Sequence, residues 1–186
     1  MSEKRKSTRG LVITVAGPHG SGRSTQAEIL AKAFKLRYVS TGTLFRERAA
    51  ETGLTLDELN VRSKDNPDFD RWLDNRAREE TIKGGVVLDA TLSGWMADNP
   101  DLRIYLYAPL KERIRRIAGR ENFSIKKAER ETAIRETAEK ERFKEFYKVD
   151  LDDLSIYDVI LNTGLFDVEA CAHILKNIVE YYMSRR

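Results

Sequence analysis

Apolar residues along this chain gather into two kinds of segment, short continuous runs and longer stretches with helical spacing. Five short runs rich in β-branched residues predict strands, at Leu11–Ala16, Arg37–Ser40, Val86–Ala90, Leu102–Ala108 and Asp158–Asn162. The stretches between them repeat apolar residues every three or four positions and predict helices. Because strands alternate with helices and most strands are apolar throughout, the pattern predicts an α/β fold, a three-layer sandwich with a five-stranded parallel sheet and helices on both faces.

Capping and turn residues indicate where several helices begin and end. Thr55 and Glu58 have the spacing of a capping box, so a short helix should follow Thr55. Asn66-Pro67 provides an N-cap and an N1 proline for a helix that runs to Gly84-Gly85. Residues 53–82 therefore place extra helices between the second and third strands, and we expect this insert to bind a substrate.

Length and composition are typical of a soluble single-domain protein. The chain has 186 residues, within the ~100–200 expected of one domain; 41% are hydrophobic and 34% are charged. The apolar runs are too short to span a bilayer and no secretory signal is recognisable, so we expect a cytoplasmic protein without a membrane partner. A single cysteine, Cys171, and the wide separation of His19 and His173 argue against a disulfide and a zinc site.

The positive net charge is confined to the N-terminus. Residues 1–10 contain four basic residues and one acidic residue, and therefore carry the whole net charge of +3. The rest of the chain is neutral, which does not support a nucleic-acid-binding surface across the protein. We therefore expect residues 1–10 to form a disordered basic tail, and we expect no nucleic-acid partner.

A glycine-rich turn between the first strand and the first helix carries the clearest chemical signal. Its sequence, GPHGSGRS from Gly17 to Ser24, fits the phosphate-loop pattern G-x-x-x-x-G-K-S/T, with arginine where lysine is expected. Small residues allow consecutive backbone N–H groups to surround phosphate oxygens, and the helix N-terminus adds partial positive charge. The residues expected to hold ATP are Gly17, Pro18, His19, Gly20, Ser21, Gly22, Arg23, Ser24 and Thr25.

Two residues of this loop have further predicted roles. The Ser24 hydroxyl is expected to bind Mg²⁺, with Thr25 as a neighbouring candidate. Arg23 is always charged and can offer two donors to one phosphate, but its planar guanidinium is wider than a lysine ammonium. The alternative, an ordinary glycine-rich turn, accounts less well for the strand, the spacing, the hydroxyl and the helix together.

Six sequence blocks follow one another in an order that indicates a family. They are GPHGSGRST at Gly17–Thr25, VSTGTLFRERA at Val39–Ala49, NPDFDRWLDNR at Asn66–Arg76, VVLDATLSGWM at Val86–Met96, APLKERIRRIAGRE at Ala108–Glu121, and the segment Arg135–Thr163. With these blocks the chain resembles the archaeal-type cytidylate kinases, a branch of the P-loop nucleoside monophosphate kinases. The resemblance implies a P-loop kinase sandwich in which residues 53–82 bind the acceptor and residues 113–147 form a helical lid.

The resemblance also implies an activity. Members of this family transfer the γ-phosphoryl of ATP to CMP or dCMP with Mg²⁺, so it implies small-molecule nucleotide partners and a monomeric enzyme. By the same resemblance, the acceptor-binding residues are Thr41, Arg46, Asp70, Asp74 and Arg76. Asp74 or Arg76 would read the cytosine edge, because a carboxylate accepts from the exocyclic amine and a guanidinium donates to the ring carbonyl. A solvated, charged helix surface is the alternative for Asp70, Asp74 and Arg76.

Further implied roles fall on one carboxylate and a set of arginines. Asp89 ends the third strand, where a carboxylate can hold Mg²⁺ through water, as in related kinases. Ser124 is expected to cap a long charged helix on which Arg135 to Arg142 reproduce the family pattern R-D/E-x-x-D/E-x-x-R. The arginines expected to act on the transferring phosphoryl, in addition to Arg23, are Arg116, Arg120, Arg135 and Arg142, with Arg113 on the same helix face. The alternative is a salt-bridged helix surface.

The chain departs from the family pattern just after the third strand. Family members typically have Gly-Arg after the acidic residue, whereas this chain has Ala90-Thr91. Loss of a charged donor to phosphate costs ~1.5–3 kcal/mol, about ten- to a hundredfold in binding or rate. Three interpretations follow: Arg46 and the lid arginines compensate, the acceptor is another nucleotide such as AMP or UMP, or the protein binds nucleotide without turnover.

Overall fold

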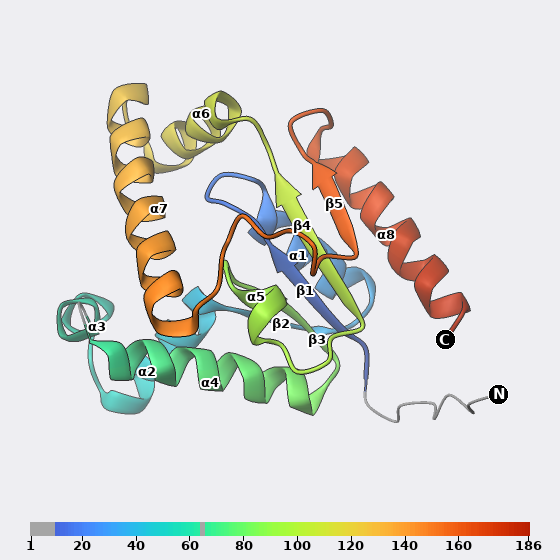
Figure 1. The fold of residues 1–186 in the computed structure, drawn as a ribbon, viewed down its shortest axis with the longest axis horizontal. Coiled ribbons are helices and arrows are strands. Elements are labelled where there is room, and N and C mark those ends of the chain that lie inside the picture. The colour runs from blue at the N-terminus through green and yellow to red at the C-terminus, as the bar shows by residue number, and fades with distance from the viewer. Residues whose placement is uncertain (1–9, 64–65) are drawn as a thin grey trace.

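A five-stranded parallel sheet forms the centre of the molecule (Figure 1). The computed structural model describes residues 10–63 and 66–186, apart from a few side chains between positions 60 and 70. The strands are β1 (Val12–Ala16), β2 (Arg37–Ser40), β3 (Val86–Asp89), β4 (Leu102–Tyr107) and β5 (Val159–Asn162). Their order is β2-β3-β1-β4-β5 and all neighbours are parallel, which confirms the predicted fold class. The predicted basic tail lies outside the described residues, except for Gly10.

Helices connect the strands and flank the sheet. Within the described ranges they are α1 (Arg23–Ala33), α2 (Thr41–Thr52), α3 (Leu56–Ser63), α4 (Pro67–Lys83), α5 (Ser93–Met96), α6 (Leu110–Glu121), α7 (Ile125–Tyr147) and α8 (Val168–Ser184). None of these helices is both long and apolar enough to cross a membrane. As predicted, α3 and α4 lie between β2 and β3 along the chain.

Local sequence explains several helix boundaries. Ser124 and Asn66 each accept a hydrogen bond from a first-turn N–H, as expected of N-caps. Thr55 and Glu58 form the predicted capping box, because each backbone N–H donates to the other residue's side chain. Ser40, predicted only as the end of a strand, also caps α2, so that β2 passes into α2 without an intervening loop.

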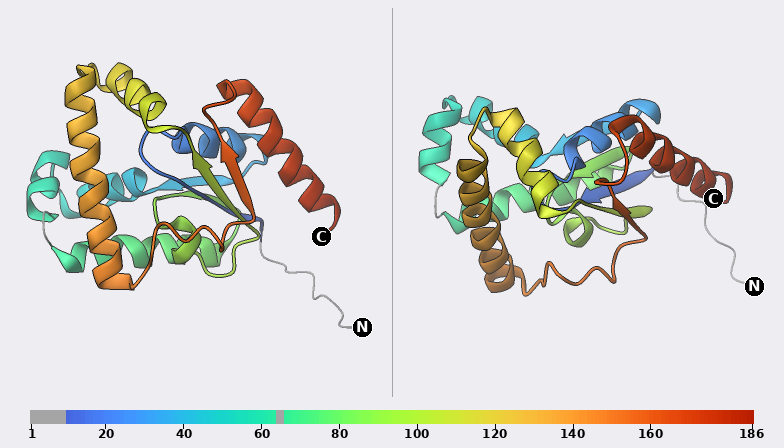
Figure 2. Two further views of the ribbon diagram at one scale, coloured as in Figure 1. Left: turned by 45° about the horizontal axis from the view of Figure 1, so that its top comes forward. Right: turned by 90° about the horizontal axis from the view of Figure 1, so that it is seen from above.

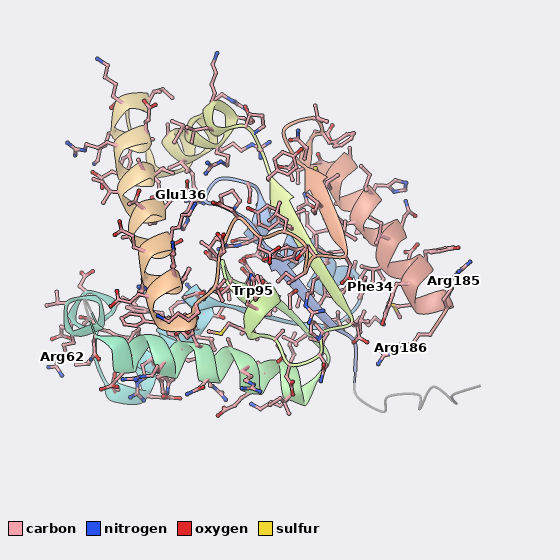
Figure 3. All side chains as sticks on the ribbon, in the orientation of Figure 1. Phe34, Arg62, Trp95, Glu136, Arg185 and Arg186 are labelled. Carbon is pink, nitrogen blue, oxygen red and sulfur yellow. The ribbon has the colours of Figure 1, made fainter. Side chains whose placement is uncertain are left out.

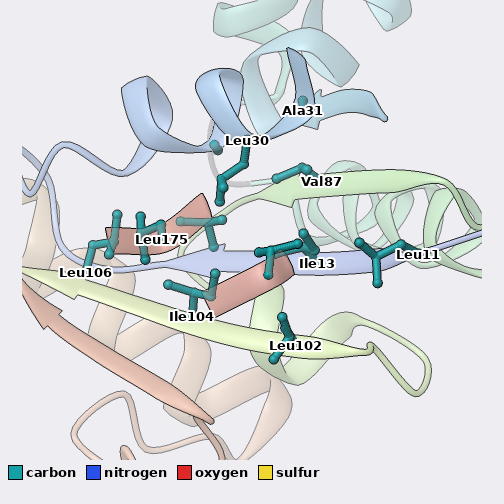
Figure 4. Packing of buried hydrophobic residues seen from close by; sticks show 12 residues of the cluster. Leu11, Ile13, Leu30, Ala31, Val87, Leu102, Ile104, Leu106 and Leu175 are labelled. Atoms are coloured by element: carbon teal, nitrogen blue, oxygen red, sulfur yellow. The ribbon is translucent and has the colours of Figure 1, made fainter. Parts of the chain in front are cut away.

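One face of the sheet packs against α1 and α8 (Figure 4). Ile13, Ile104 and Leu106 project from the central strands, while Leu30 comes from α1 and Leu175 from α8. All five side chains are fully buried. Burial of an aliphatic side chain of this size contributes about 1.5–3 kcal/mol to stability, so this face is a large part of the core.

The opposite face is covered by α2 and α4. Leu44 of α2 and Ala77 of α4 pack on Val12 of β1 and on Val86 and Leu88 of β3. These strands are buried along their whole length, whereas the edge strands β2 and β5 contain exposed positions. The internal strand β4 is also partly exposed, at its carboxyl end, and the predicted apolar run of β5 is partly exposed because it lies at the edge of the sheet.

The carboxyl ends of the parallel strands open toward α7. In two views α7 extends from α6 at one end to the region of α2 and α4 at the other, facing the loop that follows β1 (Figures 1 and 2). The connection between α6 and α7 is short, since α6 ends at Glu121 and α7 begins at Ile125. Ligands of open parallel sheets bind at this edge, so it is the place to look for a site.

Replacement of a core side chain should test the packing of the sheet. Ile104→Ala removes a fully buried side chain between the sheet and the helices α1 and α8, and should lower the free energy of unfolding by about 2–5 kcal/mol. The matched control is Ile134→Ala on α7, whose side chain is 59% exposed and which should cost little. The measurement is urea unfolding, in which the dependence of the unfolding free energy on urea concentration should be the same for wild type and both variants. Equal losses of unfolding free energy in the two variants would show that Ile104 is not a core residue.

Candidate active site

The loop after β1 is a tight backbone cradle at the carboxyl edge of the sheet. Gly17 has φ 143°, and a Cβ there would overlap the carbonyl oxygen of Leu106. Gly20 has φ 77°, and a Cβ there would lie 2.7 Å from the carbonyl oxygen of Arg113. Both positions therefore require glycine, because the loop is in contact with β4 and α6.

The first turn of α1 is available to an anion. Gly22 caps the helix in the left-handed conformation and provides no side-chain acceptor for the first amides. Ser24 and Thr25 are exposed in this turn. Unsatisfied N–H groups and the helix dipole together favour a phosphate here. This geometry supports the predicted phosphate loop, with one difference: the His19 N–H already donates to Glu136 Oε1, at 3.1 Å.

A cavity of about 850 Å³ opens between the phosphate loop, α6 and the loop that precedes α8. We call it the α6-side cavity; its lining includes Gly22, Thr25, Arg116, Arg120, Thr163 and Phe166. Arg116 donates from Nη2 to the Thr163 carbonyl at 2.8 Å and from Nη1 to the Thr163 hydroxyl at 3.0 Å. The Thr163 hydroxyl donates in turn to the Ser21 carbonyl at 2.7 Å. Arg116 therefore lines the cavity and is also fixed to the base of the phosphate loop.

Arg113 supports the loop from beneath rather than facing a ligand. It is only 9% exposed, and its Nη1 donates to the His19 carbonyl at 2.9 Å and to Glu136 Oε1 at 2.6 Å. Glu136 lies between α7 and the phosphate loop (Figure 3). Arg113 is therefore a positioning residue. Sequence reasoning placed it beside Arg116 on one helix face, a spacing that did not show which of the two reaches a cavity.

The remaining predicted lid arginines do not converge on one point. Arg120 lines the α6-side cavity, with a side chain that is 63% exposed and donates to Glu121 at 2.9 Å. Arg135 is exposed on α7 and does not line this cavity. Arg142 lines a second cavity, on the other side of the loop. The predicted cluster is thus distributed over two sides of the phosphate loop.

This second cavity, of about 90 Å³, lies between α2, α4, the end of β3 and α7. We call it the α4-side cavity. Its walls include the apolar Leu44, Leu73, Leu88 and Met96 and the polar Thr41, Asp74, Thr91 and Arg142. Two of the residues predicted to bind the acceptor, Thr41 and Asp74, are thereby brought together.

Three other predicted acceptor residues are placed differently. Arg46 is exposed on α2 and does not line the α4-side cavity. Arg76 pairs with Glu79 and Glu80, both at 3.2 Å, on the surface of α4, so the structure does not bring it to the cavity. The side chain of Asp70 lies outside the described residues. Of the two residues predicted to read the cytosine edge, the structure brings Asp74 and not Arg76 to this cavity.

Asp89 connects the phosphate loop to the ends of two strands. Its carboxylate is 2% exposed; Oδ1 accepts from Arg23 Nε at 2.5 Å and Oδ2 accepts from the Tyr38 hydroxyl at 2.8 Å. Burial and the Asp89 charge raise the pKa of Tyr38 to about 12, so this phenol remains a donor. Arg23 Nη1 donates to the Gly17 carbonyl at 2.8 Å and to the Thr91 hydroxyl at 3.1 Å. Tyr38 was not foreseen, because nothing in its strand signals a polar partner.

Magnesium fits this oxygen-rich edge in part. The described residues contain no group of three or more His, Cys, Asp or Glu side chains able to hold an ion, so the protein alone does not form a metal cage. Mg²⁺ commonly takes one or two protein oxygens together with phosphates and water. The exposed Ser24 hydroxyl suits that role. Asp89 suits it only through water, since Arg23 and Tyr38 already bind both of its oxygens.

Glu139 ties α7 to the phosphate loop. Its Oε1 lies 3.0 Å from His19 Nε2, and both side chains are 20% exposed. Burial raises the pKa of Glu139, but the hydrogen bond from His19 and the charges of His19, Arg23 and Arg142 outweigh burial and lower it. The ionised carboxylate therefore stabilises the contact between α7 and the loop.

Stability should follow the ionisation of Glu139. Because its pKa is lowered in the folded state, the contribution is present above its ordinary value, near 4.5, and is lost as pH falls through the folded value. The Tm of wild type should exceed that of Glu139→Gln near pH 7, and the gap should shrink below pH 4.5. The exposed Glu145→Gln on α7 is the control. A gap that is constant with pH would refute this role.

Similarity to known proteins supports the fold and identifies the family of this chain. A family model described as an AAA domain matches residues 16–135. This range includes the phosphate loop, the end of β3 at the α4-side cavity, α6 at the α6-side cavity and the first part of α7. Among solved structures, shikimate kinase from Bacteroides thetaiotaomicron superposes with a TM-score of 0.61 over 91% of this chain and 98% of that one. Its sequence is 16% identical, so this likeness concerns the fold alone.

Closer relatives match almost end to end. The cytidylate kinase of Staphylothermus marinus is 45% identical over 174 residues, which cover 93% of this chain and 98% of the relative. That of Archaeoglobus fulgidus is 40% identical over 169 residues, covering 90% and 94%. Identity at this level, over nearly the full length of both proteins and on a parallel sheet that opens into a phosphate loop, shows that the chain belongs to the cytidylate kinase family of P-loop kinases.

Proposed function

We propose that this protein transfers the γ-phosphoryl of ATP to CMP or dCMP, giving ADP and the nucleoside diphosphate. The observation that carries the proposal is a pair of unequal cavities joined through the phosphate loop: the loop lines the larger one, and Arg23 of the loop is hydrogen-bonded to Thr91 in the wall of the smaller one. A phosphoryl group bound at the loop would lie between a donor on one side and an acceptor on the other. The relatives of high identity, all named cytidylate kinases, support the same reaction.

ATP is the occupant proposed for the α6-side cavity, which is the larger one. The amides of the phosphate loop and the N-terminus of α1 bind the phosphates. Arg116 and Arg120 line this cavity and provide positive charge beside them. The exposed Ser24 hydroxyl would hold Mg²⁺, which would supply further positive charge beside the phosphates.

The α4-side cavity suits the base of a pyrimidine nucleotide. Its volume of about 90 Å³ and its apolar walls favour a single ring over a fused purine. Asp74 supplies a carboxylate that accepts from the exocyclic amine of cytosine, whereas the matching position of uracil is a carbonyl and would repel it. Arg142 lies at the same cavity and adds positive charge for the acceptor.

Catalysis in this proposal depends on alignment and charge rather than on a general base. An oxygen of the acceptor phosphate attacks the γ-phosphorus while the bond from that phosphorus to the β,γ-bridging oxygen breaks, and ADP leaves with that oxygen. The attacking phosphate is already an anion, so no proton needs to be removed. Closure of α6 and α7 over the loop would exclude water, which otherwise hydrolyses ATP. We propose that the enzyme acts as a cytoplasmic monomer.

Acceptor specificity gives the direct test. Purified protein with ATP and Mg²⁺ should produce ADP when CMP or dCMP is added, and much less with UMP, AMP or GMP. The measurement is ADP formation under identical conditions with each acceptor. Turnover with AMP or UMP but not with CMP or dCMP would support the phosphoryl transfer and show that the acceptor is a different nucleotide. ATP-dependent thermal stabilisation without ADP from any acceptor would identify a nucleotide-binding protein that has lost turnover.

The two cavities should be separable by kinetics. Arg120→Ala should raise the KM for ATP and Arg142→Ala the KM for CMP, each about ten- to a hundredfold if a charged hydrogen bond to phosphate is lost. The control is Arg130→Ala, an exposed arginine on α7 that lines none of the cavities described here. Unchanged kinetics in both site variants would show that the predicted lid role is wrong.

A further inference from the structure

Two positions at which this chain departs from the expected pattern are in direct contact. Position 23 has arginine where the phosphate-loop pattern has lysine, and position 91 has threonine where the family resemblance places arginine. Arg23 Nη1 donates to the Thr91 hydroxyl at 3.1 Å. Relative to the expected pattern, a guanidinium is thus gained at position 23 and lost at position 91, and these two side chains are in direct contact.

The Arg23 side chain turns away from the proposed donor side. It contacts the Gly17 carbonyl, Asp89 and Thr91, and none of these lines the α6-side cavity, although Gly22 and Thr25 beside it do. Thr91 lines the α4-side cavity, and Gly17 and Thr91 together line a third cavity, of about 250 Å³, that adjoins it. The guanidinium therefore lies where the phosphate loop meets the proposed acceptor site.

Its neighbours fix this guanidinium and leave one edge available. Asp89 accepts from Nε, and the Tyr38 hydroxyl holds the other oxygen of that carboxylate. Nη1 has two acceptors, while Nη2 donates to none of the described residues. The side chain as a whole is 16% exposed, so most of it is shielded from solvent. A planar guanidinium held at Nε is well suited to present its terminal nitrogens to phosphate oxygens.

We propose that Arg23 binds the phosphate of the acceptor nucleotide, in place of the arginine expected at position 91, and does not primarily bind the β- and γ-phosphates of ATP. Asp89 and Tyr38 are its positioning residues. The proposal rests on the proposed function, since it assigns one arginine of this site to the acceptor. It also accounts for how the loss of arginine at position 91 is tolerated.

Exchange of the two residues is the decisive experiment. Arg23→Thr should raise the KM for CMP about ten- to a hundredfold and change the KM for ATP less than about threefold. Thr91→Arg alone should also impair CMP binding, because two guanidiniums compete for Asp89. The double variant Arg23→Thr/Thr91→Arg should recover the KM for CMP to within about fivefold of wild type. The affinity for CMP without ATP, measured by titration calorimetry, should likewise be lower in Arg23→Thr and in Thr91→Arg than in wild type, and should recover in the double variant.

Tyr38→Phe tests the positioning role. It should raise the KM for CMP about two- to tenfold in wild type and have no further effect in the Arg23→Thr background, since the group it orients is then absent. A structural role for Tyr38 alone would instead change the Tm equally in both backgrounds without coupling in KM. Arg130→Thr, the same substitution at an exposed arginine of α7, is the control and should leave both KM values unchanged.

Several outcomes would overturn the proposal. These are a rise in the KM for ATP rather than CMP in Arg23→Thr, failure of the double variant to recover, or absence of CMP binding by wild type. If Arg23→Thr does not fold, because Asp89 is left buried without a cation, Thr91→Arg and the double variant still decide it. Failure of the proposed function can be distinguished from these outcomes. Wild type would then not phosphorylate CMP, whereas the CMP affinities of wild type and the variants, measured by calorimetry, would still show which residue binds CMP.

Discussion

The buried ion pair between Asp89 and Arg23 determines the geometry of the whole carboxyl edge of the sheet. A carboxylate that is 2% exposed needs a partner, because an unpaired buried charge costs several kcal/mol. Arg23 supplies it from the start of α1, and the hydroxyl of Tyr38 on β2 satisfies the second oxygen. One carboxylate on β3 therefore fixes the phosphate loop relative to its neighbouring strands.

The helix α7 extends this arrangement from the sheet to both proposed nucleotide sites. Glu136 accepts from the His19 N–H and from Arg113, and Glu139 contacts the His19 ring. One turn further on, Arg142 reaches the α4-side cavity. A connection of a few residues joins α7 to α6, which lines the α6-side cavity. Movement of α7 would thus change the phosphate loop and the α4-side cavity together, as the proposed mechanism, which depends on alignment, requires.

Most of the fold could be predicted, because its signals are local. Apolar runs, the caps at Ser124 and Asn66, and the glycine turn after the first strand each act within a few residues, and the elements they predict are present. Strand order and the exposure of β5 depend on distant pairing and carry no comparable local signal. The predicted single-domain division into acceptor insert and lid remains a prediction, since shape alone does not show which helices move.

Periodicity, glycines at fixed spacing and ordered motifs are enough to specify the fold class, the phosphate loop and the family. The direction of each charged side chain, in contrast, depends on how distant segments pack together. Arg23 turns toward Thr91, Arg113 lies beneath the loop, Arg76 pairs on the surface of α4, and Asp74 reaches a cavity. The reason is physical: a long charged side chain takes its direction from the partners that distant segments bring near it, and sequence spacing does not specify those partners.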